Sequence, residues 1–124
     1  MKYIRRLNAI PHNGGSRDKL PKELVLRCHS GEKDVGHRDI YGRMSYDRPS
    51  NTIRTGFRSP SKGRYAHPTL NRAITAREAA RIQTFPDDYQ FMGNNTQIAT
   101  QIGNAVPVKL AEVFAEHLRK LDGM

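Results

Sequence analysis

The strongest constraint on the fold is a helix-start signal at Thr75, followed by a sharp stop at Pro86. In the run Thr75-Ala76-Arg77-Glu78 the hydroxyl and the carboxylate have the spacing of a capping box, in which both side chains accept from otherwise unpaired backbone N–H groups. Pro86 ends the helix because proline disfavours helical geometry in the residue before it. One short helix is therefore expected between these two residues.

Two more helices are expected after this one. A short helix fits residues 96–102, and Gly103-Asn104 should break it. Pro107 then stands in the first turn of a last helix, which should run to about Lys120. Apolar side chains fall on one face of this helix, and such a stripe is normally buried. The stripe consists of Leu110, Phe114, Leu118 and Leu121, widened by Ala111 and Val113.

The beginning of the chain is expected to be extended or looped. Residues 1–10 fit a short strand or an extended lead-in, and residues 11–16 (PHNGGS) fit a turn, since glycine tolerates positive φ. The two glycines followed by Ser16 and Arg17 would also let a backbone approach a phosphate, and a simple connecting turn is the equal alternative. Residues 20–26 fit either one turn of helix or a short strand.

The middle of the chain has a β pattern. Residues 31–39 are polar and are expected to form a surface loop, whereas residues 40–57 alternate apolar and polar side chains. That alternation predicts two or three short β-strands. The expected fold class is α+β: a small, irregular mixed-β lobe over residues 1–70, followed by two or three C-terminal helices over residues 71–124.

Positive charge is concentrated in the first part of the chain. Residues 1–72 carry 16 Lys or Arg against 6 Asp or Glu, whereas residues 73–124 carry 5 against 6. A basic half joined to a near-neutral half favours a polyanion-binding surface on a structural support, with a solvated basic face as the alternative. No apolar run approaches the ~18 residues that span a bilayer. Binding to a membrane surface is disfavoured because the basic residues are spread through Gly- and Pro-rich sequence and not along an amphipathic helix. The single cysteine excludes an intrachain disulfide, so a cytoplasmic location is expected.

Other reactive side chains do not form a recognisable site. Arg27 and His29 flank Cys28, but neighbours on a strand point apart, so Cys28 is expected to be a small, buried or half-buried structural residue. The five histidines show no ligand spacing, and one cysteine cannot build a Cys-rich zinc site. The Asp87-Asp88 pair follows Pro86 in a turn and is expected to be a cap or a solvent-facing pair.

Two blocks closely resemble the C-terminal end of the cytosine-5 DNA methyltransferases. They are RAITAREAARIQTFP (Arg72 to Pro86) and QIGNAVP (Gln101 to Pro107), with isoleucines at 74 and 82 where the family has leucines and Val108 where a second proline is common. A weaker resemblance to the target-recognition domain of bacterial members covers the earlier residues. Its segments are Asn13 to Arg17, Leu20-Pro21, Tyr41 to Met44, Pro49 to Ile53, Ser59, Lys62 to Arg64, and His67-Pro68.

The resemblance implies roles for particular residues. Asn104, Ala105 and Val106 would line the S-adenosylmethionine pocket, and Thr52 would lie at the DNA backbone near the flipped nucleotide. The residues expected to bind DNA are Arg17, Arg43, Thr52, Arg54, Arg58, Lys62 and Arg64. Structural roles are expected for Arg72, Arg77, Glu78 and Gln83.

The catalytic signatures of the family do not occur in these 124 residues. The family takes its nucleophile from a Pro-Cys loop, its acid from Glu-Asn-Val, and the other half of its cofactor pocket from a Phe-x-Gly-x-Gly segment. The chain is therefore expected to be the C-terminal part of a DNA (cytosine-5-)-methyltransferase of the restriction-modification type, inactive alone. Its expected partners are double-stranded DNA and a catalytic N-terminal half, from the same parent chain or a separate subunit.

Alternatives to this hypothesis are a stand-alone, non-catalytic DNA-binding module and a gene remnant. A third is self-association through the apolar stripe of the last helix, because an exposed apolar patch tends to find another surface.

Overall fold

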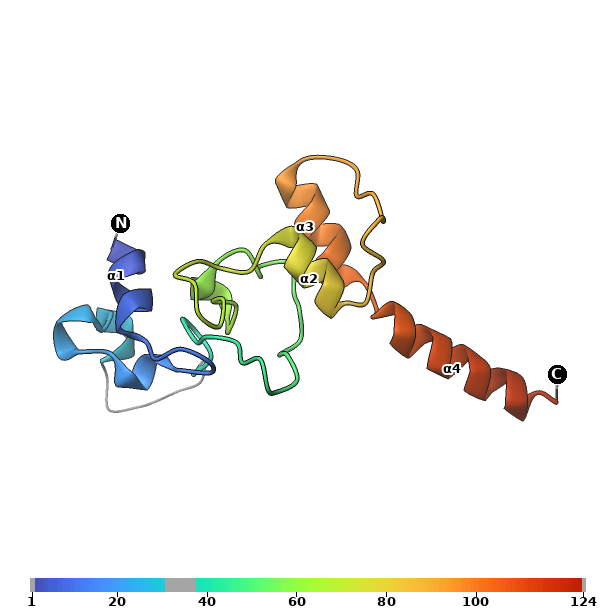
Figure 1. The fold of residues 1–124 in the computed structure, drawn as a ribbon, viewed down its shortest axis with the longest axis horizontal. Coiled ribbons are helices and arrows are strands. Elements are labelled where there is room, and N and C mark those ends of the chain that lie inside the picture. The colour runs from blue at the N-terminus through green and yellow to red at the C-terminus, as the bar shows by residue number, and fades with distance from the viewer. Residues whose placement is uncertain (1, 31–37, 124) are drawn as a thin grey trace. The chain divides into compact units, whose positions relative to one another are not determined.

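The computed structural model describes residues 2–30 and 38–123. The α-helices in these ranges are α1 (Lys2–Ala9), α2 (Ala76–Ile82), α3 (Asn95–Asn104) and α4 (Val108–Leu121) (Figure 1). Short 3₁₀-helices lie between α1 and α2: η1 (Arg17–Lys19), η2 (Lys22–Leu24), η3 (Arg27–His29) and η4 (Pro60–Lys62). No helix within the described ranges is long and apolar enough to cross a membrane.

Chain contacts divide the molecule into two compact units. We call residues 1–52 with 56–74 the N-terminal unit, and residues 53–55 with 75–124 the C-terminal unit. The tripeptide 53–55 thus belongs to the unit formed by the last three α-helices.

The expectation of a mixed-β lobe is wrong. Across the described residues, strand pairing is limited to two isolated bridges, Arg43 with Ala66 and Ala66 with Ala73. The ladder does not extend for two reasons. Tyr41 has a φ of 60°, which lies outside the β region, and the Tyr46 N–H donates to the side chain of Asn13 and not to a neighbouring strand. Over residues 40–57 the buried positions form a run at 41–44 and recur singly at 53 and 57, after an exposed run at 46–52. The alternation of apolar and polar residue types therefore accompanies turns, not strands.

The first ten residues are also not a strand. They form α1, which ends at Ala9, and its Leu7 side chain and the following Ile10 are buried. Because Leu7 and Ile10 are three residues apart, helical geometry points their side chains to the same side. Residues 20–26 contain η2 with flanking turns, so the helical one of the two expected alternatives holds. Residues 31–37 of the expected surface loop lie outside the described residues.

A small apolar core holds the N-terminal unit together. Its buried members are Leu7, Ile10, Tyr41 and Ala66, and Leu20, Leu26 and Ile40 pack against them. These side chains come from α1 and the residue after it, from the segment of η1 to η3, and from the turns around residues 41 and 66. The core therefore joins segments far apart in the sequence.

A buried arginine lies beside this core. Arg43 has 0% exposure, and its five guanidinium N–H groups all have acceptors inside the protein. Nε donates to Ile10 O (3.1 Å), Nη1 to His67 O (2.9 Å) and Leu70 O (2.8 Å), and Nη2 to Leu7 O (2.7 Å) and Asn71 Oδ1. Burial lowers the pKa of Arg43, and carbonyls near the C-terminal end of α1 offset the lost hydration with their partial negative charge.

A second arginine fixes the Asn-Gly-Gly-Ser turn. Arg64 donates to the carbonyls of Gly14 (3.1 Å) and Gly15 (3.2 Å), and it forms a 3.0 Å ion pair with Asp39. A Cβ atom on Gly42 would lie 2.8 Å from the Arg64 guanidinium carbon, so the guanidinium takes the space that a side chain at 42 would need.

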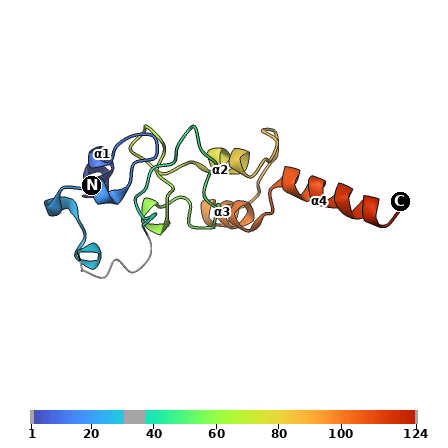
Figure 2. The ribbon, with the colours of Figure 1, turned by 90° about the horizontal axis from the view of Figure 1, so that it is seen from below.

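The helix start expected at Thr75 is confirmed, and the second helix begins at Asn95, one residue before its expected start. Thr75 caps α2 in a complete capping box with Glu78, and Asn94 caps α3 in another with Gln97. Helix α3 is longer than expected, because Gly103 and Asn104 continue it instead of breaking it. Helices α2 and α3 lie side by side in both ribbon views (Figures 1 and 2).

The turn after α2 is held by aromatic packing. The rings of Phe85, Tyr89 and Phe91 contact one another with centroids 4.8–5.1 Å apart. Arg77 donates to Tyr89 O (3.1 Å) and lies over the Phe91 ring. The structural role expected for Arg77 agrees with these contacts.

We predict that Arg43→Met strongly destabilises the N-terminal unit. The substitution leaves several buried carbonyls unpaired, at about 1–3 kcal/mol for each group that water cannot reach. Arg58→Met is the matched control, since Arg58 is exposed and surface substitutions usually change stability by less than about 0.5 kcal/mol. Urea unfolding followed by circular dichroism measures both, and equal midpoints for the two variants would contradict the role given to Arg43.

Candidate functional site

The loop between α3 and α4 presents one polar and one apolar side chain to solvent. Asn104 ends α3 and is exposed, Ala105 is half-buried, and Val106 is 61% exposed. An amide side chain both donates and accepts hydrogen bonds, and an exposed valine offers an apolar contact. The loop thus has the chemistry of one wall of a site for a ligand with polar and apolar parts.

Residues that follow α2 fix both ends of this loop. The buried side chain of Gln83 donates from Nε2 to Ile102 O (3.0 Å) and Ala105 O (2.9 Å). The Val108 N–H donates to Gln83 O (3.2 Å). Gln83 is therefore a structural residue, as expected, and it sets where the loop leaves α3 and enters α4.

The residues expected to bind DNA fall into two groups. Arg54, Arg58, Lys62 and Thr52 are exposed, and Arg17 is half-buried. Arg58 and Lys62 belong to the N-terminal unit, in and just before the short helix η4, and Arg54 belongs to the C-terminal unit. Thr52, Arg54, Arg58 and Lys62 are thus accessible from solvent, and Arg17 only in part.

Arg43 and Arg64 form the second group. Arg43 is fully buried, so the expectation that it contacts DNA is corrected: its guanidinium is consumed by internal carbonyls and cannot reach a phosphate in this conformation. Arg64 is partly exposed but spends its donors on Asp39, Ser16 and the glycine turn. Sequence position alone does not distinguish such arginines from Arg58.

The glycine turn itself uses its backbone donors inside the protein. Asn13 N donates to Pro68 O (2.8 Å) and Gly14 N to Met44 O (2.9 Å). A phosphate at this turn would have to compete for these two N–H groups. The geometry therefore favours the connecting-turn alternative.

Positive charge gathers near His29. The pKa of His29 is lowered from 6.5, first by desolvation and then by the nearby cations Arg17 and Arg6. Arg6 also donates to Leu24 O (2.9 Å) and lies over the Tyr41 ring. The N-terminal unit thus carries a positive field around η1 and η3.

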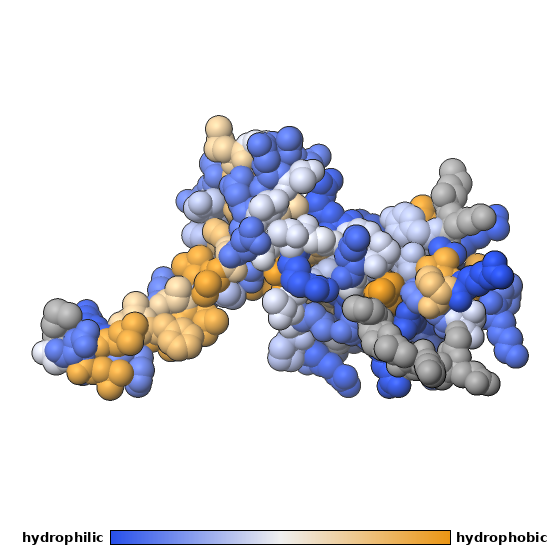
Figure 3. All heavy atoms as spheres, turned by 180° about the vertical axis from the view of Figure 1, so that it is seen from behind, coloured by the Kyte–Doolittle hydropathy of each residue, from blue (hydrophilic) through white to orange (hydrophobic). Residues whose placement is uncertain are grey.

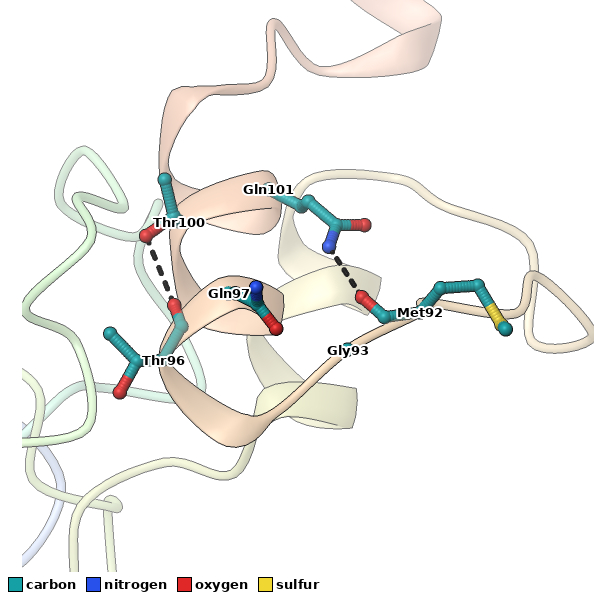
Figure 4. Close-up of a pocket in the computed structure, with 6 residues that line it drawn as sticks. All are labelled: Met92, Gly93, Thr96, Gln97, Thr100 and Gln101. Atoms are coloured by element: carbon teal, nitrogen blue, oxygen red, sulfur yellow. Dashed lines mark hydrogen bonds between the residues drawn. The ribbon is translucent and has the colours of Figure 1, made fainter.

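A shallow hollow runs along the exposed side of α3 (Figure 4). It has a volume of about 490 Å³ and is lined by Met92, Gly93, Thr96, Gln97, Thr100 and Gln101. Part of its polar surface is already used, because Gln101 donates to Met92 O (2.8 Å) and Thr100 to Thr96 O (3.0 Å). No sequence pattern pointed to this hollow, since its lining residues are exposed residues of α3 and of the loop just before it.

The remaining reactive side chains form no site. Cys28 is exposed, so the expectation of a buried or half-buried thiol is wrong. Asp87 pairs with Arg81 through two hydrogen bonds (2.7 and 3.0 Å), and Arg81 lowers its pKa, which agrees with a solvent-facing carboxylate in the turn. Among the described residues, which exclude His37, no group of three or more His, Cys, Asp and Glu is placed to hold a metal ion.

The apolar stripe of α4 is exposed. Leu110, Phe114, Leu118 and Leu121 have exposed fractions of 47%, 60%, 59% and 69%. Figure 3 shows apolar side chains gathered along this helix. Such a stripe is normally buried, but no residue of α4 is buried here, so the stripe is the exposed apolar patch on which the expectation of self-association rests.

Comparison with known proteins gives one consistent family. A family model described as C-5 cytosine-specific DNA methylase matches residues 3–120. Type II methylase M.HgiDII of Herpetosiphon aurantiacus is 40% identical over 127 residues, which cover 98% of this chain and 35% of that protein. Type II methyltransferase M1.BsuMI of Bacillus subtilis (strain 168) is 45% identical over 100 residues, covering 80% and 23%. The chain spans about a third or less of the length of these relatives.

We predict that Arg17→Ala raises the pKa of His29 toward 6.5. Removing a nearby cation lowers the cost of protonating the imidazole. Because the pKa is lower in the folded state, folding stability that depends on His29 is complete above about pH 6.5 and is lost as the pH falls through the folded pKa. An NMR titration of the His29 ring measures the change, with Lys19→Ala as the control. An unchanged midpoint in Arg17→Ala would contradict the proposed proximity.

Proposed function

We propose, since this chain belongs to the C-5 cytosine-specific DNA methylase family, that it is the DNA-recognising, C-terminal part of such an enzyme and completes its cofactor pocket. The observation that carries the proposal is the exposed run of cations at 54, 58 and 62 within a segment matched to this family. C-terminal placement is supported by the two sequence blocks at 72–86 and 101–107. The substrate is duplex DNA, and the product is 5-methylcytosine.

Exposed arginines and a lysine would hold the DNA through its phosphates. Most protein–DNA hydrogen bonds go to phosphate and sugar, and they set the register of the protein on the duplex. Methylation at carbon 5 requires the target base to leave the stack, and methyltransferases are among the enzymes that flip bases. We assign Thr52, Arg54, Arg58, Lys62 and Arg17 to contacts with DNA near that base, and Arg43 and Arg64 to holding the N-terminal unit in shape.

S-adenosylmethionine fits the α3–α4 loop as one wall of its site. When bound, this cofactor supplies the methyl group that is transferred to cytosine. The Asn104 amide would make polar contacts with it and Val106 an apolar contact, while Gln83 holds the loop from behind. Because these residues form only one wall and the sequence holds no Pro-Cys nucleophile, we infer that this chain alone transfers no methyl group.

The catalytic portion of a methylase is the partner that we propose for the exposed stripe of α4. The relatives are about three times as long as this chain, so a large part of the enzyme lies outside the matched segment. A stripe of four large apolar side chains, each about half exposed or more, is more than a stable helix surface normally leaves open. Self-association through the same stripe is the competing outcome.

We predict salt-sensitive binding of this chain to duplex DNA. Phosphate contacts release counterions, so log K falls with log salt at about 0.9 per contact. Arg58→Ala should weaken binding and reduce that slope by about 1, and Arg54→Ala should act in the same direction. Asn104→Ala should leave DNA affinity unchanged, because the residue is assigned to the cofactor. Fluorescence anisotropy with a labelled duplex at several salt concentrations measures these values, and equal losses from Arg58→Ala and Asn104→Ala would refute the division of roles.

We predict that Phe114→Ser weakens association with the catalytic portion of a family member that lacks the matched segment. Removing a large apolar side chain from the stripe reduces the apolar area buried in the complex. Glu112→Ser is the matched control, because Glu112 lies on the opposite face of α4. Titration calorimetry measures the affinity. Sedimentation that shows the chain alone as a stable dimer, lost in Phe114→Ser, would favour the competing outcome.

A further inference from the structure

We propose that Gly103 is a positioning residue that links DNA contact at Arg54 and Thr55 to the cofactor loop, residues 104–106. This inference rests on the proposed function, because it assigns DNA to the first segment and S-adenosylmethionine to the second. All of these residues belong to the C-terminal unit.

Close backbone approach explains why glycine occupies position 103. A Cβ atom built there would lie 2.3 Å from Thr55 N and 2.6 Å from both Arg54 C and Thr55 Cα. Real Cβ atoms do not approach backbone atoms below 3.0 Å, and a backbone atom cannot rotate away as a side chain can. Segment 53–55 therefore lies directly against the last turn of α3.

Local conformation gives no other reason for this glycine. Gly103 lies inside α3 and is not among the glycines with positive φ. Within a helix, glycine is less favourable than any residue except proline, so alanine would stabilise α3 if nothing occupied the space. The residue type at 103 is thus set by segment 53–55 and not by the helix.

The same turn of α3 is held on another side by Gln83. Its Nε2 donates to Ile102 O and Ala105 O, the residues on either side of the Gly103-Asn104 pair. Ile102 is fully buried and Ile53 is 3% exposed, so the segment has little room to shift independently. Interiors packed this closely transmit displacement instead of absorbing it.

A displacement of segment 53–55 must therefore move the start of the cofactor loop. Arg54 and Thr55 are both exposed, and the proposed function assigns Arg54 to DNA. The linkage is reciprocal, because an effect of DNA on cofactor affinity requires an equal effect of the cofactor on DNA affinity. Gly103 acts through its neighbours and touches neither ligand.

The test is an NMR titration of the whole chain with a short mixed-sequence duplex. The amide signals of Asn104, Ala105 and Val106 are expected to shift together with those of Arg54 and Thr55, with the same midpoint. Shifts at 54 and 55 with none at 104–106 would overturn the linkage and leave the proposed function intact. If no amide in the chain shifts, the proposed DNA binding fails and the linkage fails with it.

A pair of alanine variants adds a second test. Gly103→Ala should push segment 53–55 away and weaken DNA binding by about fivefold or more, at the low end of ordinary couplings between sites. Thr100→Ala on the exposed side of α3 introduces the same residue into the same helix and should leave DNA affinity unchanged. In Gly103→Ala the 104–106 signals should no longer follow the DNA titration. Wild-type affinity and wild-type coupling in Gly103→Ala would overturn the proposal; if that variant does not fold, the wild-type titration decides.

Discussion

The N-terminal unit depends on one buried guanidinium. Arg43 supplies five N–H donors and finds five acceptors, four of them backbone carbonyls, at the end of α1 and in the turn after His67. No sheet is available to pair these segments, because strand pairing in the described residues stops at two isolated bridges. The planar fork of Arg43 bonds two other chain segments to its own with five donors in a fixed geometry, whereas a lysine has only three donors. The small apolar core around Leu7 and Ile10 then closes over this centre.

An arginine-rich sequence thus serves two purposes in one unit. Arg43 and Arg64 donate hydrogen bonds to backbone carbonyls inside the protein. These carbonyls therefore have partners without a regular sheet. The exposed cations at 58 and 62 are then carried by turns whose shape is fixed from within. The C-terminal unit follows a different principle, because two capping boxes start its helices and Gln83 ties the α3–α4 loop. The exposed cations at 58 and 62 and the loop at 104–106 are therefore each held in place by polar side chains other than those proposed to bind a ligand.

Local signals were readable from the sequence, and long-range ones were not. The capping box at Thr75 involves residues three positions apart, so its chemistry is visible in four letters, and helix α2 follows it. The fate of Arg43 depends on acceptors 24 to 36 positions away, so nothing near it separates it from the exposed Arg58. The strands expected over residues 40–57 failed for the same reason: the alternation of apolar and polar residue types does not show whether the backbone finds a neighbouring strand, and here residues 41–44 are buried in turns while residues 46–52 are exposed. Periodicity shows that one face of α4 is apolar but not what covers it, so the partner of the exposed stripe could not be predicted from these residues alone.

The central claim is that this chain recognises DNA for a methylase without carrying the catalytic chemistry. It is tested most directly by methyl transfer from labelled S-adenosylmethionine to mixed-sequence duplex DNA, with the purified chain alone and with the catalytic portion of a family member added. We expect no transfer by the chain alone and transfer when the two are combined. Transfer by the chain alone would contradict it, because it would mean that neither a Pro-Cys nucleophile nor a glycine-rich cofactor loop is required.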